Sequence, residues 1–65
     1  MTNLRAAMRR KQLYAQSIAE LLHIHVNTAR LKISGDAEFT VAEAIAVKNA
    51  FFPEHDLEYL FGKKD

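Results

Sequence analysis

The strongest constraint on the fold of this chain is the spacing of its apolar residues between Ala15 and Ile33. Two short stretches there repeat apolar residues at intervals of three and four, which is the spacing of one face of a helix. These residues are Ile18, Leu21 and Leu22, followed by Val26, Ala29 and Ile33. Residues 23–25 break the pattern. The spacing therefore predicts two short helices, over residues 15–22 and 26–33, joined by a tight turn.

The remaining sequence predicts three further helices, over residues 3–11, 41–50 and 57–61. Asn3 stands where a short polar side chain can cap the first of them. Thr40 and Glu43 have the spacing of a capping box at the start of the second. The two glycines and the single proline lie outside the predicted helices. We therefore expect an all-α fold of about five short helices, in one domain over residues 1–65.

The apolar faces of these segments supply the expected core. The candidates outside the first two helices named above are Leu4, Ala7 and Met8, then Val41, Ala44, Ile45 and Val47, and finally Leu57, Leu60 and Phe61. Phe51 and Phe52 are expected to anchor the core or a partner surface. A chain of 65 residues buries only about 60% of its unfolded surface. Its stability depends on this packing, because the absence of Cys excludes a disulfide.

Several classes of protein are disfavoured by what the sequence lacks. No uncharged apolar run approaches the roughly 18 residues of a membrane span. No apolar stretch of a signal peptide follows the basic start of the chain, so a cytoplasmic protein is expected. His23 and His25 lack a third metal ligand nearby, and Ser17 and Ser34 lack the partners of a nucleophile. We expect no metal, cofactor, small-molecule substrate or enzymatic activity.

Charge is unevenly distributed along the chain. Residues 1–33 hold six Arg and Lys residues against one Glu, whereas residues 34–65 hold three Lys residues against seven Asp and Glu residues. This asymmetry favours a protein with one face that meets a polyanion. The alternative is that the charges are ordinary solvated side chains that cluster by chance.

The predicted helix over residues 26–33 has a mostly polar outer face. With its apolar stripe turned inward, the residues that point away are Asn27, Arg30, Leu31 and Ser34. Arg pairs in a fork with guanine, Asn pairs with adenine, and an apolar side chain contacts the thymine methyl group. Behind a turn of three residues, this set favours a helix that lies in the major groove of DNA. The plainer interpretation is a packed helix with ordinary charges on its surface.

These features also occur together in a known family. The chain resembles the Cro/CI-type helix-turn-helix regulators, also called the XRE family, and in particular their short phage-encoded members. The resemblance covers nearly the whole chain. It is carried by Ala19 between Ile18 and Leu22, by Lys32-Ile33-Ser34-Gly35, by residues 38–43 (EFTVAE) and by residues 51–61 (FFPEHDLEYLF). It implies a five-helix lambda-repressor-like domain with the helix-turn-helix at its second and third helices, about residues 15–34.

Three positions depart from the family pattern. His23 stands where the family usually has a Gly in the turn, so the turn either holds a β-carbon near a positive φ or bends differently. Ala15 stands where the family frequently has Gln, and Gln16 follows it. Ala29 is smaller than the Ile, Leu or Val that is common at its position.

The resemblance implies a division between base contacts and phosphate contacts. The base-reading positions are His25, Val26, Asn27, Arg30 and Leu31. The phosphate-binding positions are Gln16, Thr28, Lys32, Arg9 and Arg10. The implied partner is double-stranded operator DNA, bound by a homodimer on two half-sites about one helical turn apart. The implied role is transcriptional control of phage genes. The aromatic residues of the acidic half are the expected dimer contact.

An alternative from a different class is a protein-interaction module. Such a module has the helix-turn-helix fold but binds another regulator instead of DNA. Ala15, His23 and the modest net charge of +1 favour this alternative. The two interpretations differ in whether Asn27 and Arg30 are exposed on the same side as Arg9 and Arg10.

Overall fold

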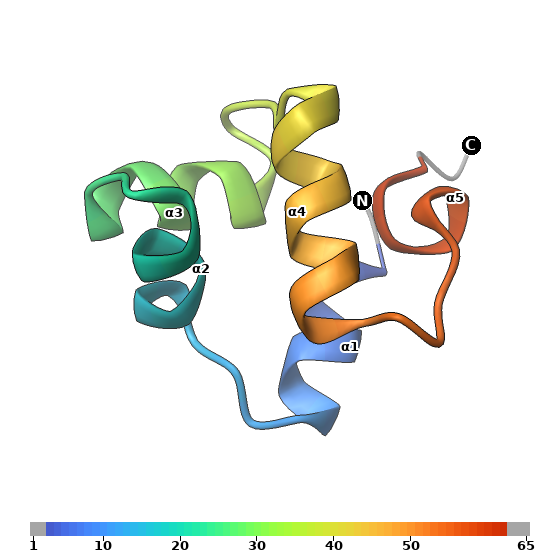
Figure 1. Ribbon diagram of the computed structural model, residues 1–65. Coiled ribbons are helices and arrows are strands. Elements are labelled where there is room, and N and C mark those ends of the chain that lie inside the picture. Colours follow the sequence, from blue (N-terminus) through green and yellow to red (C-terminus); the bar gives the residue numbers. More distant parts are fainter. Residues whose placement is uncertain (1–2, 63–65) are drawn as a thin grey trace.

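The computed structural model of this protein describes residues 3–62, and this part of the chain folds into five helices (Figure 1). They are α1 (Leu4–Arg10), α2 (Ala15–Leu22), α3 (Val26–Ser34), α4 (Val41–Phe51) and α5 (Leu57–Phe61). The expected all-α fold is confirmed for the described residues, and each helix begins and ends within one residue of its predicted bounds. None of these helices has the length and the apolar character that a membrane crossing requires.

The helices surround a cluster of buried side chains. α2 and α3 lie together on one side, α4 stands in the middle with α1 at its lower end, and α5 lies on the other side (Figure 1). α4 packs against both α2 and α5, and α1 packs against α5 and α3. The buried residues are Leu4, Ala7, Met8, Ile18, Ala19, Ala29, Val47, Phe52 and Leu60. The predicted stripe of α1 is therefore correct. Of the two adjacent phenylalanines, Phe52 is buried and Phe51 is half-buried.

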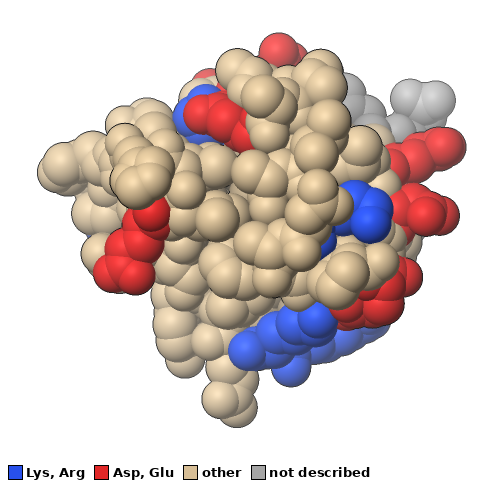
Figure 2. Space-filling model, in the orientation of Figure 1, with Lys and Arg blue, Asp and Glu red and all other residues tan. Residues whose placement is uncertain are grey.

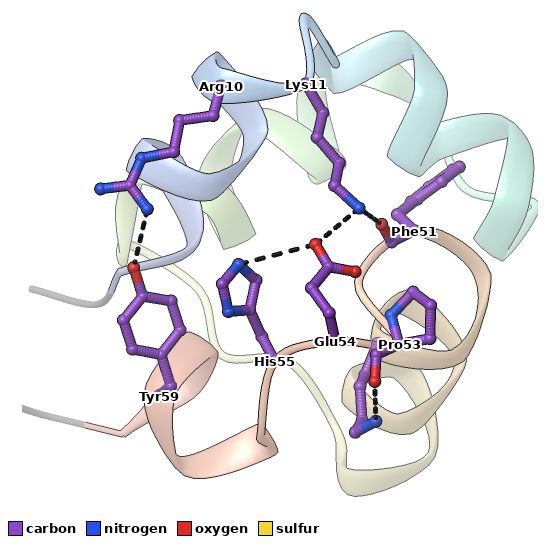
Figure 3. A network of polar contacts seen from close by, with 8 residues as sticks. Arg10, Lys11, Phe51, Pro53, Glu54, His55 and Tyr59 are labelled. Atoms are coloured by element: carbon purple, nitrogen blue, oxygen red, sulfur yellow. Dashed lines mark hydrogen bonds and ion pairs between the residues drawn. The ribbon is translucent and has the colours of Figure 1, made fainter.

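Polar contacts fasten α1 to the chain around α5 (Figure 3). The Lys11 ammonium pairs with the Glu54 carboxylate at 2.7 Å and donates to the carbonyl of Phe51 at 2.7 Å. The hydrogen bond from this ammonium lowers the pKa of Glu54. Asn3 occupies the N-cap position of α1, but its side chain donates to the carbonyl of Tyr59 at 2.9 Å and does not cap the helix. The predicted cap is wrong because α5 offers Asn3 an acceptor from elsewhere in the fold.

α4 has the predicted start but a different buried face. The Thr40 hydroxyl accepts the N–H of Glu43 at 3.1 Å, and the Glu43 carboxylate accepts the N–H of Thr40 at 2.9 Å, which confirms the capping box. Val47 is buried, as expected. Val41 and Ile45 were expected in the core but are 75% and 40% exposed. This prediction is wrong because α4 carries apolar residues on nearly every side, so its periodicity does not identify the face that packs.

An ion pair connects α3 to the start of α4. The Nζ of Lys32 lies 2.7 Å from Oε1 of Glu43 and also donates to the carbonyl of Glu38 at 3.1 Å. The ammonium stands 5.9 Å from the centre of the Phe39 ring. Its hydrogen bond to Glu43, together with the bond from the Thr40 backbone, lowers the pKa of that carboxyl group. The pair therefore ties the last turn of α3 to the first turn of α4, across the loop that joins the two helices.

Removing the charge of Glu43 is expected to destabilise the fold. In Glu43→Gln the amide oxygen still accepts from Thr40, but the Lys32 ammonium loses its counter-charge. We expect the free energy of unfolding at neutral pH to fall by about 1–2 kcal/mol, measured by chemical denaturation. The matched control is Glu58→Gln, which removes an exposed charge from α5 and should change this free energy by less than about 0.5 kcal/mol.

The same pair gives stability a defined pH dependence. The folded-state pKa of Glu43 lies below its unfolded-state value. The contribution of the pair is therefore complete above the unfolded-state pKa and is lost as the pH falls through the folded-state pKa. The stability difference between the wild type and Glu43→Gln should close between about pH 7 and about pH 3. A difference that stays constant over this range would contradict the assignment.

Candidate nucleic-acid interface

The turn between α2 and α3 uses a backbone conformation that favours glycine. His23 follows the last residue of α2 with φ 56° and ψ 44°, in the left-handed region. The N–H of Ile24 donates to the carbonyl of Ala19 at 3.0 Å, which closes the end of α2. Ile24 packs against the core, whereas His23 is exposed. The chain therefore keeps a tight turn and holds a β-carbon at positive φ, where glycine would be less strained.

His25 is the N-cap of α3. Its Nδ1 accepts the N–H of Asn27 at 3.1 Å. This hydrogen bond satisfies one of the free N–H groups at the start of the helix and orients the imidazole ring. His25 was expected to read a base, and the structure gives it a role in beginning the helix. At the other end, Gly35 follows α3 with φ 95°.

The outer face of α3 is open to solvent. Ala29 is the only buried residue of this helix, and it marks the direction of the core. At 3.6 residues per turn, Asn27 and Leu31 project about 160° away from Ala29, so they form the outermost line of the helix. Both side chains are exposed, which confirms their predicted orientation. Val26 is half-buried and packs against the core, so this base-reading candidate lies nearer the interior.

One flank of α3 borders an open groove of about 440 Å³. The groove is lined by Arg5, Met8 and Arg9 of α1, by Leu13, Tyr14 and Ala15 where the chain enters α2, and by Arg30, Ile33 and Ser34 of α3. Arg30 projects about 100° from the buried direction of α3, on the groove side. Met8 is buried, whereas the three arginines are exposed. The groove therefore combines an apolar floor with cationic walls.

The cationic side chains of the described residues fall into two groups. Those with a carboxylate or another protein oxygen as partner are Arg10, Lys11, Lys32 and Lys48. Within residues 3–62, Arg5, Arg9 and Arg30 have no hydrogen-bond or ion-pair partner. All three line the groove beside α3. The unpaired positive charge is therefore gathered in one place, next to the outer face of α3.

The other predicted phosphate contacts lie elsewhere on the surface. Gln16 donates its amide to a glutamate one turn further along α2, at 3.1 Å. Arg10 donates to a tyrosine hydroxyl of α5 at 3.4 Å (Figure 3). Thr28 is exposed on the flank of α3 opposite to Arg30. The structure thus brings Arg9 together with Arg30 and separates both from Arg10.

Two residues of the candidate site change their assignment. Lys32 was expected to bind phosphate, but its ammonium is engaged by Glu43, so we give it a structural role. Arg5 was not among the phosphate-binding positions that the resemblance implies, although it shares the groove with Arg9. The sequence could have indicated this, because Arg5 and Arg9 are four residues apart, which places both side chains on one face of a helix.

Comparisons of the chain with protein-family models, with curated proteins and with solved structures found no match. The site is therefore interpreted from its own geometry. Within residues 3–62, no three His, Cys, Asp or Glu side chains are grouped as a metal site would require.

The role of His25 as a cap can be tested by replacing it. His25→Ala removes the acceptor of the Asn27 N–H and should lower the free energy of unfolding by about 1 kcal/mol. His25→Ser offers a hydroxyl that can cap the helix and should restore most of this loss. Thermal and chemical denaturation measure both effects. Equal stability of the wild type and His25→Ala would contradict the capping role.

Proposed function

We propose that this protein is a sequence-specific regulator of transcription that binds double-stranded DNA. In this proposal α2 and α3 form the helix-turn-helix of a lambda-repressor-like domain. The observation that carries the proposal is that the exposed outer face of α3 stands beside the groove of Arg5, Arg9 and Arg30. The resemblance to the Cro/CI-type regulators supports the same function and suggests control of phage genes.

The outer face of α3 suits the major groove of DNA. With its side chains an α-helix is about 10–12 Å across, and the major groove, about 12 Å wide, admits one α-helix. The amide of Asn27 matches the donor and acceptor of adenine, and Leu31 suits the methyl group of thymine. Cations beside the helix hold phosphates and fix the register of the helix on the duplex.

The same arrangement weighs against a module that binds only protein. Asn27 and Arg30 are both exposed, and Arg30 lines the groove with Arg9, whereas Arg10 lies apart and contacts Tyr59. Three guanidinium groups in one groove repel one another unless an anion lies between them. A polyanion is the partner that compensates this repulsion over several residues.

Selection from a random pool of duplex DNA tests the proposed function. We expect enrichment of a two-fold symmetric sequence, with an affinity that falls steeply as salt is raised. Asn27→Ala should lose preference at one base pair, at a cost of about 1–3 kcal/mol for the preferred base. Asn49→Ala, at an exposed position of α4, is the matched control and should bind like the wild type. No enrichment, with weak binding that does not respond to salt, would contradict the proposal.

A homodimer on two half-sites gives so small a domain useful affinity. The aromatic residues expected at the contact are Phe51, Phe52, Tyr59 and Phe61, and all of them belong to the core or pack against it. The exposed apolar residues Val41 and Ile45 lie one turn apart on α4. Most of the molecular face over α2 and α4 is uncharged (Figure 2). A second copy on this part of α4 would bury apolar surface without separating charges from water.

The dimer is tested by placing a charge on α4. Val41→Lys should shift the protein toward monomer in light scattering and weaken its binding to a two-half-site duplex by about tenfold or more, because the ammonium opposes burial of this face. Ala50→Lys is the matched control, since it adds the same charge at an exposed position about 180° around α4. A wild type that is monomeric both free and on DNA would contradict the dimer.

A further inference from the structure

Arg30 lies on the flank of α3 and not on its outermost line. It projects about 100° from the buried direction of the helix, whereas Asn27 and Leu31 project about 160°. The groove confirms this placement, because Arg30 shares one wall with Ile33 and Ser34. When a helix lies in a major groove, its outermost line faces the base edges and its flanks face the phosphates at the groove margins.

Arg5 and Arg9 form the wall that faces Arg30 across the groove. They are four residues apart on α1, so their side chains are neighbours. No carboxylate is among the described residues that line the groove. Like charges at this spacing reduce stability unless an anion compensates them. The groove therefore has the composition of an anion-binding site.

We infer that Arg5, Arg9 and Arg30 together bind the phosphodiester backbone of one DNA strand. Arg30 then fixes the position of α3 and does not read a base, and sequence discrimination falls to Asn27 and Leu31. The inference rests on the proposed DNA binding. It adds Arg5 to the interface and moves Arg30 from base contact to backbone contact.

The shape of the groove suits a strand of nucleic acid. The groove is continuous with the outer face of α3, because Arg30 and Ser34 belong to both. A strand at the edge of a major groove that holds α3 therefore passes over it. Each guanidinium can donate two parallel hydrogen bonds to phosphate oxygens.

The test compares affinity and its salt dependence in single variants. Binding is measured to the selected duplex and to a scrambled duplex of the same length, after circular dichroism has shown each variant to be folded. Arg5→Ala, Arg9→Ala and Arg30→Ala should each weaken binding to both duplexes by about tenfold. Each should also reduce the slope of log affinity against log salt by about 0.9.

Lys48→Ala is the matched control. It also removes one positive charge, but from α4, where the Lys48 ammonium donates to the carbonyl of Pro53 at 3.4 Å. Its salt slope should equal that of the wild type.

Arg30→Lys separates the two possible roles of this residue. A backbone contact needs mainly the positive charge, so Lys should keep most of the salt slope and leave the preferred sequence unchanged. A base contact needs the guanidinium fork, so Lys would lose preference at one base pair.

Two results would overturn the inference while leaving the DNA-binding function intact. One is a change of base preference at a single position in Arg30→Lys, with an unchanged salt slope in Arg30→Ala. The other is a salt slope in Arg5→Ala and Arg9→Ala equal to that of Lys48→Ala. A wild-type protein that binds no duplex would overturn the proposed function and the inference together.

Discussion

The main constraint on this structure is that α3 must be held in place although little of that helix is buried. Ala29 alone is buried in this helix, and a side chain of that size contributes little to stability. The helix is therefore fastened at its ends and along one side. His25 caps its start, Gly35 follows its end in a left-handed conformation, and the pair of Lys32 and Glu43 holds it to α4. Because these contacts use the ends and the inner side, the outer face is left free.

The distribution of charge follows from the same arrangement. Arg10, Lys11 and Lys32 serve the fold: Arg10 and Lys11 join α1 to the distant chain around α5, and Lys32 joins α3 to the start of the next helix. The cations without protein partners in the described residues are the ones that line the groove beside α3. A small domain gains stability from cations that are paired and loses some from cations that are crowded together. A group of unpaired arginines beside an open helix face is therefore the feature that most needs a functional explanation.

The sequence predicts those features that depend on near neighbours in the chain. The capping box of Thr40 and Glu43 and the outward direction of Asn27 both follow from helical spacing, and the structure agrees. Features that depend on tertiary approach were not predictable. Lys32 finds its carboxylate only when the loop after α3 brings the start of α4 back to the end of α3, and α4 buries a face other than that of Val41. The groove likewise exists only because α1 packs beside α3.

A titration of isotope-labelled protein with its selected duplex, followed by nuclear magnetic resonance, tests whether α3 and its groove contact DNA. We expect shifts in the backbone and side-chain signals of Asn27 and Leu31, and in the guanidinium signals of Arg5, Arg9 and Arg30. Signals around the α4–α5 connection should stay unchanged. Shifts confined to α4 and α5, with the outer face of α3 unaffected, would contradict the claim that α3 and its groove form the nucleic-acid interface.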